Sequence, residues 1–230
     1  MVDVNIQPRS RGLAADAFDP GQEFHQAKPA YVQLGIKRGM DIAATLVAAP
    51  FALTLVGAIA LVVRLDGNPA FYGQPRLGRD GKVFTLWKLR SMVPNADRKL
   101  EQHLRENPAA RAEWDRTQKL RKDPRITPLG RYLRKYSLDE LPQLWNVLKG
   151  DMSLVGPRPM FPEQRQHYPD TAYFEMRPGI TGLWQISERN NCSFAERAKR
   201  DTSYARMLSL RADLYILIMT AVVVVRGTGC

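Results

Sequence analysis

Ile42–Val63 reads IAATLVAAPFALTLVGAIALVV, a run of 22 residues without a charged side chain. About 20 apolar residues are enough for a helix to cross the hydrocarbon core of a bilayer. Pro50 lies near the middle of the run, where a proline removes one backbone hydrogen bond and clashes with the preceding turn. The run therefore predicts a membrane-embedded helix that is broken at Pro50.

Three arrangements of this helix are compatible with the sequence. It could span the bilayer, enter and leave through the same leaflet as a re-entrant helix, or lie buried in the core of a domain. Lys37 and Arg38 precede the run and Arg64 follows it, so the positive-inside rule favours neither orientation. The residues alone leave the spanning and re-entrant helices nearly equal and disfavour the buried one.

The rest of the chain is expected to form one folded unit behind a tail. Residues 1–34 mix prolines and charges without an apolar run, which is typical of a disordered tail. Residues 35–66 contain the membrane helix. Residues 67–230 are long enough to bury one core and are predicted to form a compact domain that faces the cytosol.

Turn signals and periodicity predict an α/β mixed domain that is mostly helical. Residues 82–90, KVFTLWKLR, alternate like a strand and follow the turn signal Asp80-Gly81. Residues 95–122 are rich in helix formers and are interrupted at Asn107-Pro108. The expected fold combines short strands, interfacial amphipathic helices and the membrane helix.

A second apolar run, LYILIMTAVVVV, extends from Leu214 to Val225 near the C-terminus. Twelve residues are too few to cross a bilayer as a helix. The run is either a buried strand or the end of a helix embedded in the membrane surface, and an interfacial position suits the arginines at 206 and 211 that precede it.

The chain is strongly basic, with 34 Lys and Arg against 23 Asp and Glu and a net charge of +11. This surplus predicts a partner with negative charge, either nucleic acid, an anionic membrane or a phosphorylated substrate. The basic run from Arg116 to Lys135 is either a solvated face or a phosphate-binding one. The two cysteines, Cys192 and Cys230, lack metal-ligand spacing, which argues against zinc and against a disulfide framework.

Two adjacent acids occur in SLDELPQ, Ser137–Gln143. Ser137 and Glu140 have the spacing of a capping box, but a helix capped by Ser137 would place Pro142 at its fifth position, where proline is disfavoured. Neighbouring carboxylates on a helix point in different directions, so they are suited to different tasks. Asp139 and Glu140 could act as nucleophile and as metal ligand or proton carrier.

Two further arginines lie in turns stiffened by proline. Pro157-Arg158-Pro159 places an arginine between two residues of fixed φ, and Arg177-Pro178-Gly179 is a second, similar turn. Such turns suit an arginine that holds a phosphate or carboxylate, although they also occur for purely structural reasons.

Four segments occur in an order that resembles a known family, the bacterial sugar transferases, which are monotopic polyprenyl-phosphate phosphoglycosyl transferases. The segments are KRGMDIAATLVAAP (37–50), GKVFTLWKLRSM (81–92), DPRITPLGRYLRKYSLDELPQLWNVLKGDMSLVGPRP (123–159) and RPGITGLWQISERN (177–190). The resemblance extends over roughly residues 35–230.

The resemblance implies that the chain transfers a hexose 1-phosphate from a UDP-hexose, galactose or glucose, to undecaprenyl phosphate. UMP would leave and surface polysaccharide synthesis would begin. In this family pattern Asp139 attacks the sugar-proximal phosphorus in a ping-pong reaction, and Glu140 binds Mg²⁺. The resemblance also implies a re-entrant helix with Pro50 at its break, a place on the cytoplasmic face of the bacterial inner membrane, and a homodimer.

The same resemblance implies a set of residues that bind substrate. Four are phosphate or nucleotide contacts: Lys88, Arg90, Arg134 and Arg158. Five others are weaker candidates, for which framework packing or surface ion pairs are the alternative: Arg177, Gln185, Arg189, Asp201 and Tyr204. Around Arg189 the sequence Glu-Arg-Asn departs from the Gly-Arg-Asn that many members of the family have.

The competing hypothesis is a membrane-anchored basic protein that binds nucleic acid or anionic lipid without catalysis. The sequence contains no helix-turn-helix, RRM or zinc pattern, and its basic run lacks the interleaved aromatic residues that bind single strands. No nucleic-acid partner is therefore expected.

Overall fold

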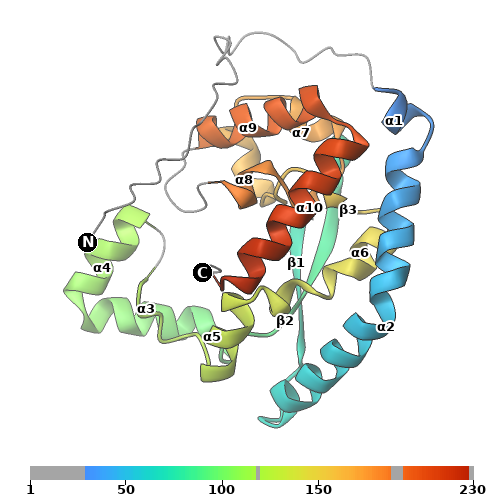
Figure 1. Cartoon of the computed structure of the whole chain (residues 1–230). Coiled ribbons are helices and arrows are strands. Elements are labelled where there is room, and N and C mark those ends of the chain that lie inside the picture. The colour runs from blue at the N-terminus through green and yellow to red at the C-terminus, as the bar shows by residue number, and fades with distance from the viewer. Residues whose placement is uncertain (1–28, 118–119, 188–193, 228–230) are drawn as a thin grey trace, which may run out of the picture.

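A computed structural model describes residues 29–117, 120–187 and 194–227. Most of the expected N-terminal tail lies outside these residues, as do Arg189, Cys192 and Cys230. In the part described, the chain is mostly helical with a few short strands, as predicted (Figure 1).

The elements follow one another along the chain with short connections. The helices are α1 Ala30–Gln33, α2 Ile36–Arg64, α3 Ala96–Glu106, α4 Pro108–Thr117, α5 Pro128–Lys135, α6 Gln143–Lys149, α7 Ala172–Glu175, α8 Leu183–Ile186, α9 Phe194–Met207 and α10 Leu210–Val225. The strands are β1 Phe71–Leu77, β2 Val83–Leu89, β3 Ser153–Val155 and β4 Gly179–Thr181. Among the residues that the structure describes, 3₁₀ turns cover Arg79–Gly81, Leu138–Glu140 and Pro162–His167.

The apolar run forms one long helix, α2, with Pro50 inside it. The hydrogen-bonded helix continues through Pro50, so the expected break is a bend, and Figure 1 shows α2 changing direction part-way along its length. Within the described residues, α2 is the helix long and apolar enough to cross a membrane, and little of it is buried in the protein. Val47 and Phe51 are 83% and 77% exposed.

The start of α2 is held by the folded domain. The Lys37 ammonium lies 2.6 Å from a carboxylate oxygen of Asp213 on α10. The Arg38 guanidinium donates to the Val147 carbonyl at 2.6 Å, at the C-terminal end of α6, where a cation also suits the helix dipole.

The end of α2 returns to the same domain. Val63 packs with Leu89 of β2 and Leu133 of α5 in a small apolar cluster. The Arg90 guanidinium donates to the Val63 carbonyl at 2.9 Å. Both ends of α2 therefore contact one body, while much of the apolar surface between them is exposed.

The hairpin of β1 and β2 is antiparallel and turns through Arg79–Gly81, as the Asp80-Gly81 signal predicted. Asp80 and Gly81 both have positive φ, 58° and 72°, a backbone that Gly and Asp tolerate better than most residues. Strand pairing places Lys88 opposite Tyr72. Because side chains alternate along a strand, Gln74 and Arg76 lie on the same face as Tyr72 and Lys88.

A second, parallel pair joins β3 to β4 and brings two distant motifs together. The Gly156 amide donates to the Thr181 carbonyl at 2.9 Å, and the Gly179 amide donates to the Pro157 carbonyl at 2.8 Å. A Cβ on Gly179 would lie 2.1 Å from the Gly156 nitrogen. Glycine is required at position 179 because two backbones meet there.

The second apolar run is helical, so a buried strand is the wrong interpretation of Leu214–Val225. Helix α10 begins after Ser209, whose hydroxyl accepts from the Ala212 amide at 3.2 Å. Tyr215 and Ile218 of α10 are exposed, and Ile216 is buried in the main core.

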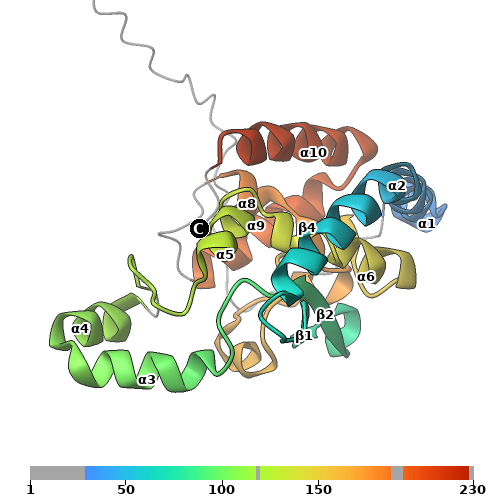
Figure 2. The same ribbon diagram turned by 90° about the horizontal axis from the view of Figure 1, so that it is seen from below.

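Helices α3 and α4 form an arm that projects from the body (Figure 2). Their junction at Asn107 matches the predicted interruption. The helix expected to reach residue 122 ends earlier, at Thr117. Arg125, which is ion-paired with Asp123 at 2.7 Å, stacks over Trp114 of α4 and connects the arm to the body.

Candidate active site

A cavity of about 860 Å³ lies between the hairpin, the Leu138–Glu140 turn, the turn after β3, and α8 and α10. It brings together most of the predicted site residues: Lys88, Arg90, Arg134, Asp139, Glu140, Arg158 and Gln185 all line it. These seven residues come from five separate parts of the chain and meet at one place.

The acid pair is presented by a short 3₁₀ turn and not by a capped helix. Ser137 has a left-handed backbone, φ 54°, and its side chain makes no capping hydrogen bond. Helix α6 starts only at Gln143, with Pro142 as its N-cap. The capping-box interpretation of Ser137 and Glu140 is therefore wrong, and the positive φ turns the chain so that Asp139 is buried at the cavity wall.

Asp139 is 7% exposed. Burial raises the pKa of its carboxyl group, because desolvation disfavours the charged form, and the neighbouring Glu140 raises it further. Lys88 and Arg134 oppose this and lower it. A poorly solvated carboxylate is a better nucleophile than one in water, and the two cations beside it attract a phosphate.

Glu140 is ion-paired with Lys88, with 2.7 Å between the Lys88 ammonium nitrogen and a carboxylate oxygen. Both side chains are about one-fifth exposed, 21% for Lys88 and 22% for Glu140. The pair keeps the Glu140 carboxylate at the cavity, within reach of an incoming cation or phosphate.

The described residues contain no cluster of three or more His, Cys, Asp and Glu side chains that could hold a metal by itself. Mg²⁺ is commonly bound by only one or two carboxylates together with substrate phosphates and water. Glu140, with Asp139 beside it, offers the oxygen donors that such a site needs. The donor set fits Mg²⁺ brought in with a phosphate-bearing substrate.

Arg134 and Arg90 lie at the same side of the cavity but differ in their contacts. The Arg134 Nε donates to the Ser91 hydroxyl at 2.9 Å, which aims the guanidinium from α5 toward the acid pair. The Arg90 guanidinium makes two bonds to the Asp66 carboxylate, at 2.6 and 2.7 Å, besides its bond to the α2 end. Arg90 thus ties α2 to β2, and these contacts are structural.

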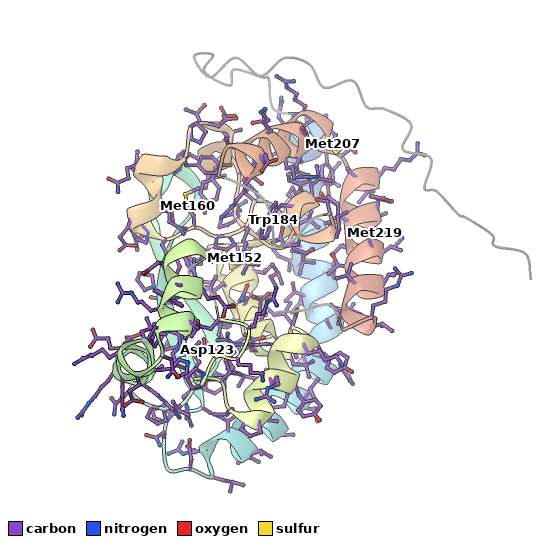
Figure 3. All side chains as sticks on the ribbon, turned by 90° about the vertical axis from the view of Figure 1, so that its left-hand side faces the viewer. Asp123, Met152, Met160, Trp184, Met207 and Met219 are labelled. Atoms are coloured by element: carbon purple, nitrogen blue, oxygen red, sulfur yellow. The ribbon has the colours of Figure 1, made fainter. Side chains whose placement is uncertain are left out.

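Arg158 enters the cavity from the turn that follows β3. Its guanidinium lies 5.5 Å from the centroid of the Trp184 ring, in the range of a cation–π contact. Trp184 and Gln185 belong to α8 and line the cavity. In the view of Figure 3, Trp184 is drawn between Met160 and Met219.

Three predicted residues are not brought to the cavity. The Arg177 Nε donates to the Gly150 carbonyl at 2.9 Å, beyond α6. Asp201 is 4% exposed and accepts from the Tyr168 hydroxyl at 2.5 Å. Tyr204 is 1% exposed and donates to Asp213 at 2.6 Å. The contacts of all three are those of framework residues. Framework packing was the alternative to substrate binding that the sequence left open for them.

Sequence reasoning missed three residues around Arg158, namely Arg76, Trp184 and Arg197. Arg76 donates to the Pro159 carbonyl and Arg197 donates to the Arg158 carbonyl. Arg76 could have been found from the sequence. A hairpin that turns at Asp80-Gly81 pairs Tyr72 with Lys88, and the alternation of side chains then places Arg76 on the same face as Lys88. No local pattern marked Arg197.

Comparison with known proteins gives a consistent match. The family model described as "Bacterial sugar transferase" matches residues 32–227. The chain is 47% identical to an "Undecaprenyl-phosphate galactose phosphotransferase" of Salmonella typhimurium, over 98% of this chain and 50% of that protein. It is 46% identical to the "Exopolysaccharide production protein ExoY" of Sinorhizobium fredii, over 84% of this chain and 87% of that protein.

A more distant relative is the "Undecaprenyl-phosphate glucose phosphotransferase" of Komagataeibacter xylinus, 34% identical over 80% of this chain and 35% of that protein. The chain spans half or less of the length of several such relatives but most of the length of ExoY. The resemblance seen in the four sequence segments is confirmed by these matches.

Proposed function

Because the chain belongs to the bacterial sugar transferase family, we propose that it transfers a hexose 1-phosphate from a UDP-hexose to undecaprenyl phosphate. The products are UMP and undecaprenyl-diphosphate-hexose, the lipid on which exopolysaccharide is built. The observation that carries the proposal is the buried Asp139 with Lys88 and Arg134 beside it and Arg158 in the same cavity. This arrangement suits a phosphate diester or diphosphate better than a neutral substrate.

The reaction proceeds in two displacements at one phosphorus atom. An Asp139 carboxylate oxygen forms a bond to the sugar-proximal phosphorus of the donor, and the bond from that phosphorus to the bridging oxygen breaks, so that UMP leaves. An oxygen of undecaprenyl phosphate then attacks the same phosphorus and releases the Asp139 carboxylate. Because the transfer is divided into two displacements at the same phosphorus, the same cations can stabilise both steps.

Lys88, Arg134 and Arg158 neutralise the negative charge that the phosphates bring into the cavity. Glu140 would hold Mg²⁺ together with donor phosphate oxygens, and the metal supplies further charge neutralisation when bound. Lys88, which bonds to Glu140 at 2.7 Å, is placed to exchange that partner for a phosphate oxygen. Gln185 is one of several neutral polar side chains at the cavity that are placed to hydrogen-bond the sugar or the nucleotide.

The apolar helix α2 and the family both indicate association with a membrane. The contacts at both ends of α2 support a re-entrant arrangement, since Lys37 and Val63 meet the same domain. If α2 spanned the bilayer, one of its two ends would lie on the opposite side of the membrane from this domain. A Ser10→Cys variant in intact cells should resist a membrane-impermeant maleimide that enters the periplasm, whereas labelling there would show that the helix spans.

UMP release from purified protein in detergent tests the function. The wild type should release UMP from UDP-galactose or UDP-glucose, with turnover only when Mg²⁺ and undecaprenyl phosphate are both supplied. Asp139→Asn and Glu140→Gln should lose turnover with the helical circular dichroism unchanged, and Glu101→Gln, an exposed acid on α3, serves as the control. Without lipid, a hexose-phosphate adduct should form on the peptide that contains Asp139.

Full turnover by Asp139→Asn would refute the role of nucleophile. If no UDP-hexose yields UMP, the proposed function itself is wrong. Comparing the two donors identifies the sugar, because galactose and glucose differ only at C4 and the preferred one will show the higher kcat/KM.

A further inference from the structure

Arg158 is held in a turn whose backbone is stiff but whose side chain needs further support. The two prolines that flank it lock φ at positions 157 and 159, yet they do not fix the guanidinium. That group lies at the cavity beside the Trp184 ring, 5.5 Å from the centroid. What aims the guanidinium must come from residues around the turn.

Two other arginines bind the backbone of this turn. The Arg76 guanidinium donates to the Pro159 carbonyl at 3.2 Å, and the Arg197 guanidinium donates to the Arg158 carbonyl. Arg76 is in turn held by the Gln74 amide oxygen at 2.5 Å and lies 3.4 Å from the centroid of the Phe161 ring. The Arg158 and Pro159 carbonyls therefore each accept a hydrogen bond from a guanidinium.

The three guanidiniums also repel one another. Burial and the charges of Arg158 and Arg197 lower the pKa of Arg76 to about 10. In the described part of the chain, no ion pair joins Arg76, Arg158 or Arg197 to a carboxylate. Of the three, only Arg158 lines the cavity, so it is the one that an anionic substrate can reach.

We propose that Arg76 and Arg197 are positioning residues that fix the Pro157–Pro159 turn and direct the Arg158 guanidinium to a phosphate of the donor. The inference rests on the proposed function and extends it. Arg76 and Arg197 are held to backbone carbonyls and cannot turn away, so their repulsion favours the Arg158 rotamers that point into the cavity.

Asp201 acquires a role through the same set of contacts. It lies four residues beyond Arg197 on α9, and its charge favours the protonated guanidinium of Arg197 in a buried place. The Tyr168 hydroxyl donates to Asp201 at 2.5 Å and holds it there. Asp201 thus supports Arg197, which supports Arg158, although Asp201 does not line the cavity.

A double-mutant cycle on UMP release tests the inference. Arg158→Met should lower kcat/KM by about 100-fold, as loss of a phosphate contact does. Arg76→Met should lower it by roughly 10-fold or more through misplacement of Arg158. In the Arg158→Met background, Arg76→Met should cost less than about 3-fold, because a residue that acts through Arg158 has nothing left to position.

Arg79→Met is the matched control, since Arg79 lies on the same hairpin, is exposed and is ion-paired with its neighbour Asp80. Arg76→Lys should restore part of the activity, because an ammonium can keep the charge and one carbonyl bond. If Arg76→Met lowers the unfolding midpoint, the same cycle with Arg197→Met provides an independent measurement.

Two results would overturn the inference if the wild type releases UMP. One is that Arg76→Met lowers kcat/KM by the same factor in the wild type and in the Arg158→Met background. The other is that Arg76→Met lowers kcat/KM no more than Arg79→Met does. A wild-type chain without UMP release would overturn the proposed function, and this inference with it.

Discussion

Replacing Lys37 by Met should destabilise the protein strongly, because it leaves a buried carboxylate without its cation. Asp213 is fully buried, and the Lys37 side chain is 13% exposed. Their charged atoms lie 2.6 Å apart, and the ammonium also donates to the Val155 carbonyl at 3.0 Å. The same pair joins the start of α2 to α10 and to the strand that leads into the Arg158 turn.

The expected loss can be estimated from these contacts. Removing one partner of a buried ion pair costs about 3–5 kcal/mol. In the Lys37→Met variant the hydroxyls of Tyr31 and Tyr204 still donate to Asp213, at 2.9 and 2.6 Å, so the lower end applies, about 3 kcal/mol. For a chain of this size roughly 2–4 °C accompany each kcal/mol, and the midpoint should fall by about 6–12 °C.

Thermal unfolding in detergent, followed by far-UV circular dichroism, measures the effect. Arg105→Met is the control, because it breaks an ion pair with Glu101 in which both side chains are exposed and should cost less than about 1 kcal/mol. The double variant Lys37→Met with Asp213→Leu should be less destabilised than the sum of its single changes, since it removes both charges together.

The reasoning is refuted if Lys37→Met unfolds within about 1 kcal/mol of the Arg105→Met control. It is equally refuted if the double variant loses the full sum of the two single effects. Either result would mean that the folded protein does not depend on Lys37 to compensate the buried Asp213.

Three further changes have expected outcomes that separate local from global effects. Because burial raises the pKa of Asp139, kcat/KM of the free enzyme should fall toward acid pH in a one-proton step centred above the usual aspartate value. Lys88→Met should move that step to still higher pH, because Lys88 lowers the pKa of Asp139, and an unmoved midpoint in pH–rate profiles would contradict this. Gly179→Ala should cost about 3 kcal/mol or more in thermal unfolding, since its Cβ would lie 2.1 Å from the Gly156 nitrogen. Phe51→Lys places a charge on the exposed apolar surface of α2 and should weaken co-sedimentation with lipid vesicles, at about 3 kcal/mol for a charge deep in the bilayer.

Local signals predicted what local forces control. The apolar helix around Pro50, the hairpin at Asp80-Gly81 and the helix interruption at Asn107 all follow from residues close together in the sequence, and all three are present. Prediction was weaker where a pattern fits two structures. The capping-box spacing at Ser137 is not used, because its backbone is left-handed.

The second apolar run shows the same limit. Leu214–Val225 has no periodicity that separates a strand from a helix, and its valines favour strands. It is a helix because Ser209 caps its start and Ile216 packs into the main core. These are contacts that the run itself does not encode.

The sequence by itself determined the chemistry available to this protein: an acid pair, arginines in stiff turns and an apolar helix, in an order typical of one family. Only the tertiary structure decided which of those side chains meet. It places Arg158 and Asp139 at one cavity, commits Arg90 to the end of α2, and buries Asp201 and Tyr204 elsewhere. The physical reason is that burial and ion pairing depend on contacts between distant segments, whereas turns and helices depend on neighbours in the chain.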